Sequence, residues 1–310
     1  MRRPNYGAIG IAFAAALWGT DPLFRFPLAN SFSATLVVLG EHLIVFPVAL
    51  LLMIVGFRRI QRLAWTDWIS LLVVAWGSSA LATILFTESF TLVSPATAIL
   101  LQKLQPLFAV AGARILLRER LPAHFGLYAV VCVVGSYLVS FGFSPIGALT
   151  AGSMTGPLFA VAAAALWGIG TVLGRSLLRK LQFPDLTAMR FVLALPLLAA
   201  INAVNGSFGT IGSITAIDVA MVIALALVPG LVSLLIYYLG LERVPASVST
   251  FLELAYPATG VLVSYLAFHQ GVTLGQAVGF ALIWLMIGQF ARQPASPVRT
   301  TALLDAGGEA

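Results

Sequence analysis

The chain alternates long apolar runs with short polar segments. Ten runs are each about as long as the roughly 20 residues that a helix needs to cross a bilayer. Strands of a membrane β-barrel alternate polar and apolar residues over about ten positions, whereas these runs are continuously apolar. The pattern therefore predicts an all-α membrane protein with ten transmembrane helices. The runs cover approximately residues 7–26, 33–55, 68–90, 94–114, 122–142, 154–174, 185–204, 217–239, 246–268 and 272–291.

The sequence also contains an internal duplication. The segment Ala14–Gly19, AAALWG, returns unchanged as Ala163–Gly168, and Pro95 returns as Pro245. Each copy holds five predicted helices, and five is odd, so the second copy enters the membrane in the opposite orientation. Inverted repeats are a recurrent architecture of secondary transporters, whose substrate site lies near mid-membrane between the halves.

We therefore expect two inverted five-helix repeats around a central cavity. The first covers residues 1–150 and the second covers 151–291, and a disordered cytoplasmic tail follows at 292–310. The alternative interpretation is that the duplication only builds a stable bundle for an enzyme or a receptor.

Composition supports the membrane assignment and removes several function classes. Hydrophobic residues make up 60% of the chain and charged residues 9%, against about 25% charged in a typical soluble domain. The single cysteine, Cys132, and three scattered histidines offer no disulfide and no His/Cys metal cluster. No metal or cofactor is predicted. No phosphate-binding G-x-x-x-x-G-K-[ST] motif is present, which argues against direct use of ATP.

The basic residues predict the orientation and the surroundings. The 17 lysines and arginines lie before the first run or follow the even-numbered runs, except for Arg25, Lys103 and Arg190. By the positive-inside rule those segments are cytoplasmic. We expect a multi-pass protein of the cell inner membrane with both termini in the cytoplasm. Its partners are then the lipid bilayer and a small-molecule substrate, and no nucleic acid.

Charged residues inside apolar runs mark the candidate site, because they are costly in lipid and usually face protein or water. Lys103 lies about nine residues from either end of its run, too far for its side chain to reach water. It needs a water-filled cavity, a substrate carboxylate or, alternatively, a structural ion pair with a buried acid. Glu253 falls at the repeat position of Gln102, next to that of Lys103. This pair of opposite charges suits a zwitterion.

Aromatic and polar residues accompany the pair. Trp18 and Trp167 occupy equivalent positions in the two copies, and Thr83, Tyr237 and Tyr256 lie on polar stripes of their helices. With Lys103 and Glu253 they form the predicted site for an amino acid with an apolar or aromatic side chain. The alternatives are tryptophans anchored at the membrane interface and a threonine that bonds only to its own helix.

Four more ionisable residues are candidates for coupling or gating, namely Asp21, Glu41, Glu88 and Arg190. Glu41 and Arg190 occupy equivalent positions, so one interpretation is an ion pair between them. The alternative interpretation is that Arg190 snorkels to the cytoplasmic face. Energy would come from the substrate gradient or from protons on Glu88 or Glu253.

Together these residues resemble the EamA-type branch of the drug/metabolite transporter superfamily. The resemblance rests on the doubled Ala-Leu-Trp-Gly segments, the helix starts at Pro95 and Pro245, and the sequence RERL at Arg118–Leu121. The length, the basic loops and the aromatic candidates are most similar to YddG-type exporters of aromatic and other neutral amino acids. The resemblance implies a basket of ten helices in which the fifth and tenth lie outside the cavity, as scaffold or dimer contact.

Four residues at three places depart from the family pattern, so no coupling mechanism is carried over from relatives. His269-Gln270 stands in place of Gly-Glu, Tyr256 in place of the Glu before Pro257, and Glu41 in place of Arg. The sequence predicts an alternating-access secondary transporter, a monomer or weak homodimer, that exports amino acids or similar metabolites. The alternatives are a passive metabolite channel and an intramembrane enzyme, although H-E-x-x-H and G-x-S-x-G motifs are absent.

Overall fold

The protein is described by a computed structural model that covers residues 5–93, 95–119, 125–143, 154–256, 259 and 273–291. The predicted tail at 292–310 and the departing pair His269-Gln270 lie outside these residues. The described part of the chain forms helices and no strands, which confirms the all-α prediction.

Up to residue 143 the helices follow one another in this order: α1 (Tyr6–Trp18), α2 (Asp21–Ser31), α3 (Ala34–Ile60), α4 (Trp65–Leu72), the π-helix η1 (Val73–Leu81), α5 (Ala82–Leu92), α6 (Pro95–Gln102), α7 (Gln105–Leu116) and α8 (Phe125–Phe141). The second part of the chain contains α9 (Thr155–Leu177), α10 (Phe183–Val204), the 3-10 helix η2 (Ser207–Ser213), α11 (Ala216–Leu225), the π-helix η3 (Ala226–Val232), α12 (Ser233–Leu241), α13 (Ala246–Leu252) and α15 (Leu274–Ala291).

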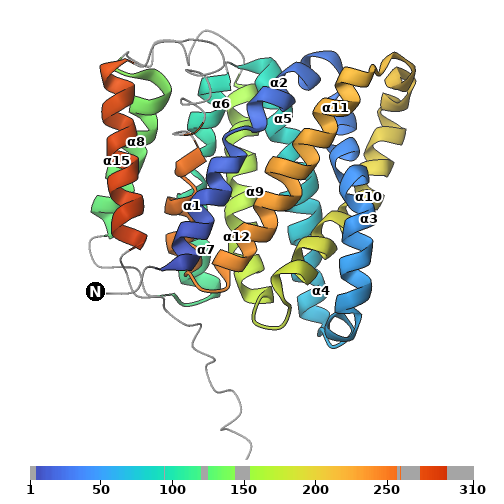
Figure 1. Ribbon diagram of the computed structural model, residues 1–310, viewed down its shortest axis with the longest axis horizontal. Helices are drawn as coiled ribbons and strands as arrows, with labels where there is room; N and C mark the ends of the chain where they lie inside the picture. Colours follow the sequence, from blue (N-terminus) through green and yellow to red (C-terminus); the bar gives the residue numbers. More distant parts are fainter. Residues whose placement is uncertain are drawn as a thin grey trace, which may run out of the picture.

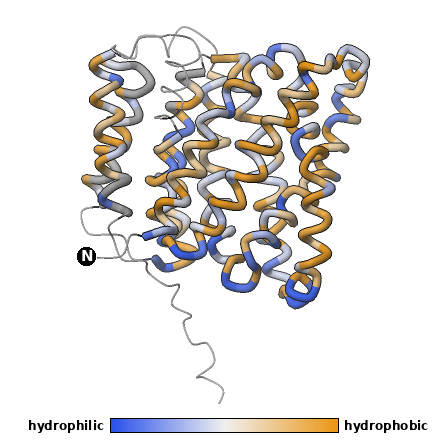
Figure 2. The backbone as a smooth tube through the Cα atoms, in the orientation of Figure 1, coloured by the Kyte–Doolittle hydropathy of each residue, from blue (hydrophilic) through white to orange (hydrophobic). Residues whose placement is uncertain are grey.

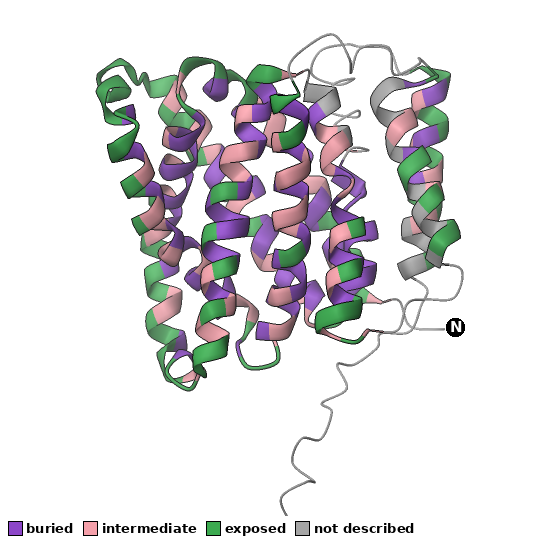
Figure 3. Cartoon of the chain, turned by 180° about the vertical axis from the view of Figure 1, so that it is seen from behind, coloured by how far each residue is buried: buried purple, intermediate pink, exposed green. Residues whose placement is uncertain are grey.

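Among the described residues, six helical segments are long and apolar enough to cross a membrane. They match the first, second, third, sixth, seventh and eighth predicted runs, and they are Tyr6–Ser31, Ala34–Ile60, Trp65–Leu92, Thr155–Leu177, Phe183–Val204 and Ala216–Leu241. Their middles are hydrophobic, and hydrophilic residues gather at the ends, most densely along the lower edge (Figure 2). Exposed and buried residues share the same helices (Figure 3), so these six segments have an apolar outer face for lipid.

Two predicted runs are interrupted at equivalent places. α6 ends immediately before Lys103 and α7 begins at Gln105, while α13 ends immediately before Glu253 and helix resumes at 255. Pro106, in the first turn of α7, explains the first break because proline has no N–H for the helical hydrogen bond. Judged by these helix ends, Glu253 is the repeat equivalent of Lys103, whereas the sequence comparison had made it the equivalent of Gln102.

The duplicated AAALWG segments hold the two parts of the chain together. α1 packs against α12, and α9 packs against α5. A Cβ on Gly19 would lie 2.8 Å from the carbonyl oxygen of Tyr256, and one on Gly168 would lie 2.9 Å from that of Gln105. Each glycine therefore lets its helix touch the interrupted helix of the other copy. α8 and α15 pack on each other at one edge of the bundle, with α3 and α10 toward the opposite edge (Figure 1).

Arg118 and Glu119, which follow α7, connect it to α13. Arg118 has a left-handed backbone with φ of 52°, and the chain then places the Glu119 carboxylate against the first turn of α13. This carboxylate accepts hydrogen bonds from the backbone N–H groups of Ala246 and Ser247, each at 3.1 Å. An anionic cap on the positive end of a helix is stabilising.

An ion pair joins α3 to α10. Arg59 donates to both carboxylate oxygens of Asp185, at 2.6 and 2.8 Å. Gly56 makes room for it, because a Cβ at this position would overlap Asp185 Oδ1. Substitution Gly56→Ala should therefore displace Asp185 and lower the stability by about 1–3 kcal/mol, seen as a lower apparent melting temperature of the protein in detergent.

The matched control is Gly209→Ala in η2, where a new Cβ meets no atom within 4 Å. Equal melting temperatures of the two variants would contradict this account of Gly56.

Candidate functional site

A cavity between the two parts of the chain offers about 160 Å³ to the centres of water molecules. One water needs roughly 10–15 Å³ by this measure, so the space holds on the order of ten waters or one small organic molecule. All sequence-predicted candidates except Glu88 line it: Trp18, Asp21, Glu41, Thr83, Lys103, Trp167, Arg190, Tyr237, Glu253 and Tyr256. Glu88 is only partly buried on α5 and is not among the lining residues.

Aromatic rings form much of the wall. The ring centres of Trp18 and Tyr237 lie 5.1 Å apart, and those of Trp167 and Phe86 also lie 5.1 Å apart. Each pair joins one copy of the duplicated segment to the third predicted run of the other copy. The indole N–H of Trp167 donates to the carbonyl of Ser78 at 2.8 Å. These contacts place both tryptophans on the cavity wall.

Lys103 lies buried at the break between α6 and α7, with 6% of its surface exposed. Its Nζ sits 4.1 Å from the centre of the Tyr256 ring, a cation–π contact. The ion pairs formed within 4.0 Å by the described residues are Arg25–Asp21, Arg25–Glu41, Arg59–Asp185 and Lys180–Asp67. None of them contains Lys103, so the alternative of a direct ion pair with a buried acid is not found.

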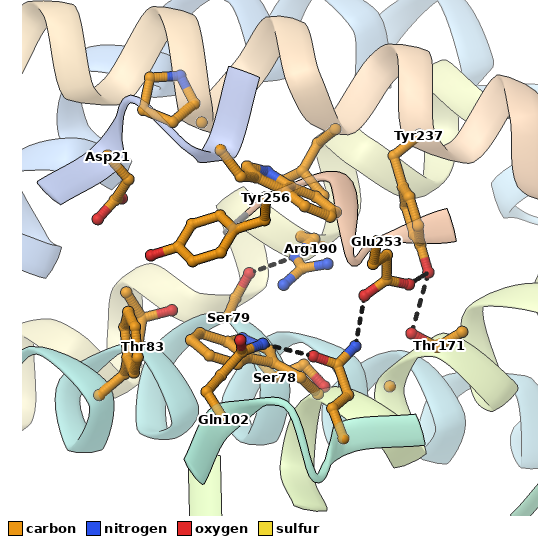
Figure 4. A pocket seen from close by; sticks show the side chains of 18 of the residues that line it. Asp21, Ser78, Ser79, Thr83, Gln102, Thr171, Arg190, Tyr237, Glu253 and Tyr256 are labelled. Atoms are coloured by element: carbon orange, nitrogen blue, oxygen red, sulfur yellow. Dashed lines mark hydrogen bonds between the residues drawn. The ribbon is translucent and has the colours of Figure 1, made fainter. Parts of the chain in front are cut away.

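Glu253 is the acceptor at the centre of a hydrogen-bonded chain (Figure 4). Tyr237 donates to its Oε1 at 2.8 Å, and Gln105 donates to its Oε2 at 2.6 Å. The chain extends from Tyr237 to Thr171 at 3.0 Å, and from Gln105 to Gln102 at 2.7 Å.

Arg25, which was not among the predicted site residues, binds two acids that line the cavity, Asp21 and Glu41. Its guanidinium donates twice to Asp21, at 2.7 and 2.6 Å, twice to Glu41, at 2.7 and 3.2 Å, and once to Thr87 at 3.0 Å. All five donors of the arginine are thereby used. The interpretation that Glu41 pairs with Arg190 is wrong, because Glu41 forms its ion pair with Arg25 instead.

Arg190 does not snorkel to the cytoplasmic face either. Its Nε donates to Ser79 at 2.6 Å and its Nη1 donates to Tyr238 at 2.8 Å. It lines the cavity without an ion-pair partner among the described residues. Lys103 and Arg190 are therefore two cavity cations whose charges no described carboxylate contacts.

Three buried polar atoms on the cavity residues have no hydrogen-bond partner in the described part of the chain. They are Gln102 Oε1, His42 Nε2 and the hydroxyl of Tyr256. Buried polar atoms are nearly always hydrogen-bonded, so these atoms are suited to bind water or a ligand.

Sequence reasoning missed several lining residues. The spacing of Asp21 and Arg25, four residues apart on one apolar helix, was a usable signal for their contact. Gln105, three residues after Gln102 in an apolar run, was another. Ser79 lies in the π-helix η1, a type of segment frequent at functional sites, but no pattern in the sequence identifies that segment.

Comparison with known proteins now identifies the family. The sequence model described as the EamA-like transporter family matches residues 5–141 and 154–288. This chain belongs to the EamA-like transporter family. It is therefore a membrane transporter of the drug/metabolite transporter superfamily, as the resemblance implied.

Two similar proteins add detail to the EamA-like assignment. The riboflavin transporter ImpX of Fusobacterium nucleatum subsp. nucleatum is 29% identical over 267 residues, which cover 84% of this chain and 89% of that protein. A protein of known crystal structure has the same fold, with a TM-score of 0.73 and 21% identity over 92% of this chain and 97% of the other.

The Arg25 cluster generates a stability prediction for this EamA-like transporter. Substitution Arg25→Gln leaves Asp21 and Glu41 buried without their counter-charge, so we expect a loss of about 3–5 kcal/mol. Adding Glu41→Gln should recover part of the loss. Apparent melting temperatures in detergent, or the yield of folded protein if the single variant fails to fold, measure both effects.

The exposed pair Lys180–Asp67 supplies the control. Lys180→Gln should cost less than about 1 kcal/mol, as exposed ion pairs do. An Arg25→Gln protein as stable as Lys180→Gln would show that the cluster is not needed for folding.

Proposed function

We propose that this EamA-like transporter exports a small carboxylate-bearing metabolite, such as an aromatic or other neutral amino acid, by alternating access. The observation that carries the proposal is the pair of cavity cations, Lys103 and Arg190, that no described carboxylate contacts. A buried cation is costly unless an anion or water compensates it. A substrate carboxylate would supply that anion.

The other cavity walls suit the remainder of an amino acid. Glu253 offers a carboxylate for an ammonium group, although Tyr237 and Gln105 already bind it. Trp18 and Trp167, with their aromatic partners, offer apolar surface for the side chain. Thr83 and Tyr256 complete the proposed binding site. An interrupted helix at the substrate is a common feature of transporters, and Lys103 and Glu253 both lie at such breaks.

A flavin is the second candidate substrate. The relative ImpX is a riboflavin transporter, and riboflavin has a planar ring system that aromatic walls suit. The observation that favours it here is the free acceptor Gln102 Oε1, which could accept from the single ring N–H of a flavin.

We further propose the architecture of ten transmembrane helices in two inverted five-helix repeats, at 1–150 and 151–291. Four features support it. The helix breaks fall at equivalent residues, the π-helices η1 and η3 occupy equivalent runs, and α1 and α9 make equivalent contacts with α12 and α5. The helices α1 and α9 also run in opposite directions (Figure 1).

Placement in the inner membrane with cytoplasmic termini is part of the same proposal, and it rests on the positive-inside rule. The packed pair α8 and α15 carries an exposed apolar surface that includes Val130 and Leu285. Lipid, or a second copy in a weak homodimer, would cover it.

The proposed coupling or gating residues remain Asp21, Glu41, Glu88 and Arg190. Energy would come from the substrate gradient or from protons.

Uptake into liposomes by the purified protein tests the function. The panel contains neutral and aromatic amino acids and riboflavin, each with and without a pH gradient. A carrier saturates with substrate concentration and shows counterflow. Linear uptake without counterflow would indicate a channel, chemical conversion of the substrate would indicate an enzyme, and uptake of no compound would contradict the proposed substrates.

Substitution Lys103→Gln tests the carboxylate contact. We expect at least a ten-fold loss of affinity for an amino acid, because a hydrogen bond to a charged group contributes about 1.5–3 kcal/mol. The apparent KM of tryptophan uptake in liposomes measures it. Riboflavin, which has no carboxylate, should be affected much less.

The surface substitution Lys180→Gln is the matched control for this measurement. Unchanged tryptophan uptake by folded Lys103→Gln protein would show that Lys103 does not bind the substrate carboxylate.

A further inference from the structure

The hydrogen-bonded chain beside the cavity has a direction. An ionised carboxylate only accepts hydrogen bonds, whereas an amide side chain donates through nitrogen and accepts through oxygen. Glu253 therefore requires the nitrogen end of the Gln105 amide, which lies 2.6 Å from its Oε2. Tyr237 donates to the other carboxylate oxygen from the opposite side.

The orientation of Gln105 then determines the orientation of Gln102. With its nitrogen toward Glu253, Gln105 turns its Oε1 toward Gln102, whose Nε2 donates to it at 2.7 Å. The Oε1 of Gln102 is then buried and has no hydrogen-bond partner in the described part of the chain. Gln102 is one of the residues that line the cavity. Dashed lines in Figure 4 follow this order from Gln102 to Glu253 and on to Thr171.

We infer that Gln102 Oε1 accepts a hydrogen bond from a ring N–H group of the transported molecule, and that Gln105 and Glu253 are positioning residues that hold the Gln102 amide in this orientation. The inference rests on the proposed function for the existence of a substrate. It adds a requirement to the substrate class, which is a donor group at this wall of the cavity.

Stability of the empty protein tests the positioning part. Gln105→Glu sets two carboxylates against each other, so we expect the apparent melting temperature to fall by several degrees. Adding Glu253→Gln exchanges the amide and the carboxylate. The amide now at position 253 can donate to the carboxylate now at position 105, and Gln102 can still donate to that carboxylate, so stability should return.

Stability losses that simply add in the double variant would overturn the inference. This measurement needs no substrate, and it decides on the positioning residues even if the proposed function fails.

Transport by the same proteins tests the contact with the substrate. The probes are two pairs, tryptophan with 1-methyltryptophan and riboflavin with 3-methylriboflavin, because each methyl group removes one N–H donor. For the parent compound that the wild type transports, we expect about a ten-fold or greater preference over its methylated partner, since an unpaired buried acceptor is costly.

Gln102→Met, Gln105→Met and their combination should lose this preference to the same extent, because Gln105 acts only through Gln102. The exchange variant, Gln105→Glu with Glu253→Gln, should keep it, and so should the control Gln61→Met on the exposed surface. A wild type without preference, or a Gln105→Met protein that retains it, would overturn the contact. Failure of the wild type to transport either parent compound would instead count against the proposed substrates.

Discussion

The cost of burying charge in a membrane protein governs this structure. For Arg25 the protein compensates that cost, because all five N–H donors of the guanidinium bind Asp21, Glu41 or Thr87. For Lys103 no described carboxylate compensates the charge, since its ammonium lies against the face of the Tyr256 ring and forms no ion pair with a described residue. The Arg25 cluster and the proposed substrate cavity thus differ in whether side chains of the protein itself neutralise the buried charge.

The interlocking of the two copies explains why the cavity has this composition. Each AAALWG segment crosses the interrupted helix of the other copy at a glycine, and its tryptophan then reaches an aromatic ring of that other copy. Neither copy can form this wall alone. The same crossing brings Lys103 and Glu253, the first residues after two helix ends, to one cavity. Duplication therefore supplies the site and not only the bundle.

Much of the candidate site was predictable, because a polar residue within an apolar run faces protein or water instead of lipid. Lys103 and Glu253 were found in this way, and Trp18 and Trp167 were found from their equivalent positions in the two copies. All four line the cavity. Pairings were not predictable. Repeat positions suggested an ion pair between Arg190 and Glu41, yet Glu41 pairs with Arg25, which lies four residues after Asp21. Repeat equivalence indicates depth in the membrane, but side-chain reach and competition among donors decide which groups bond to each other.

The amino-acid sequence by itself determined the all-helical membrane fold, the family and the set of residues that cannot face lipid, because hydropathy and duplication are properties of the chain order. Only the tertiary structure decided the helix breaks at Lys103 and Glu253, the cluster around Arg25, and the directed chain from Gln102 to Glu253. These depend on angstrom-scale distances between residues far apart in the chain, and hydrogen bonds exist only within such distances.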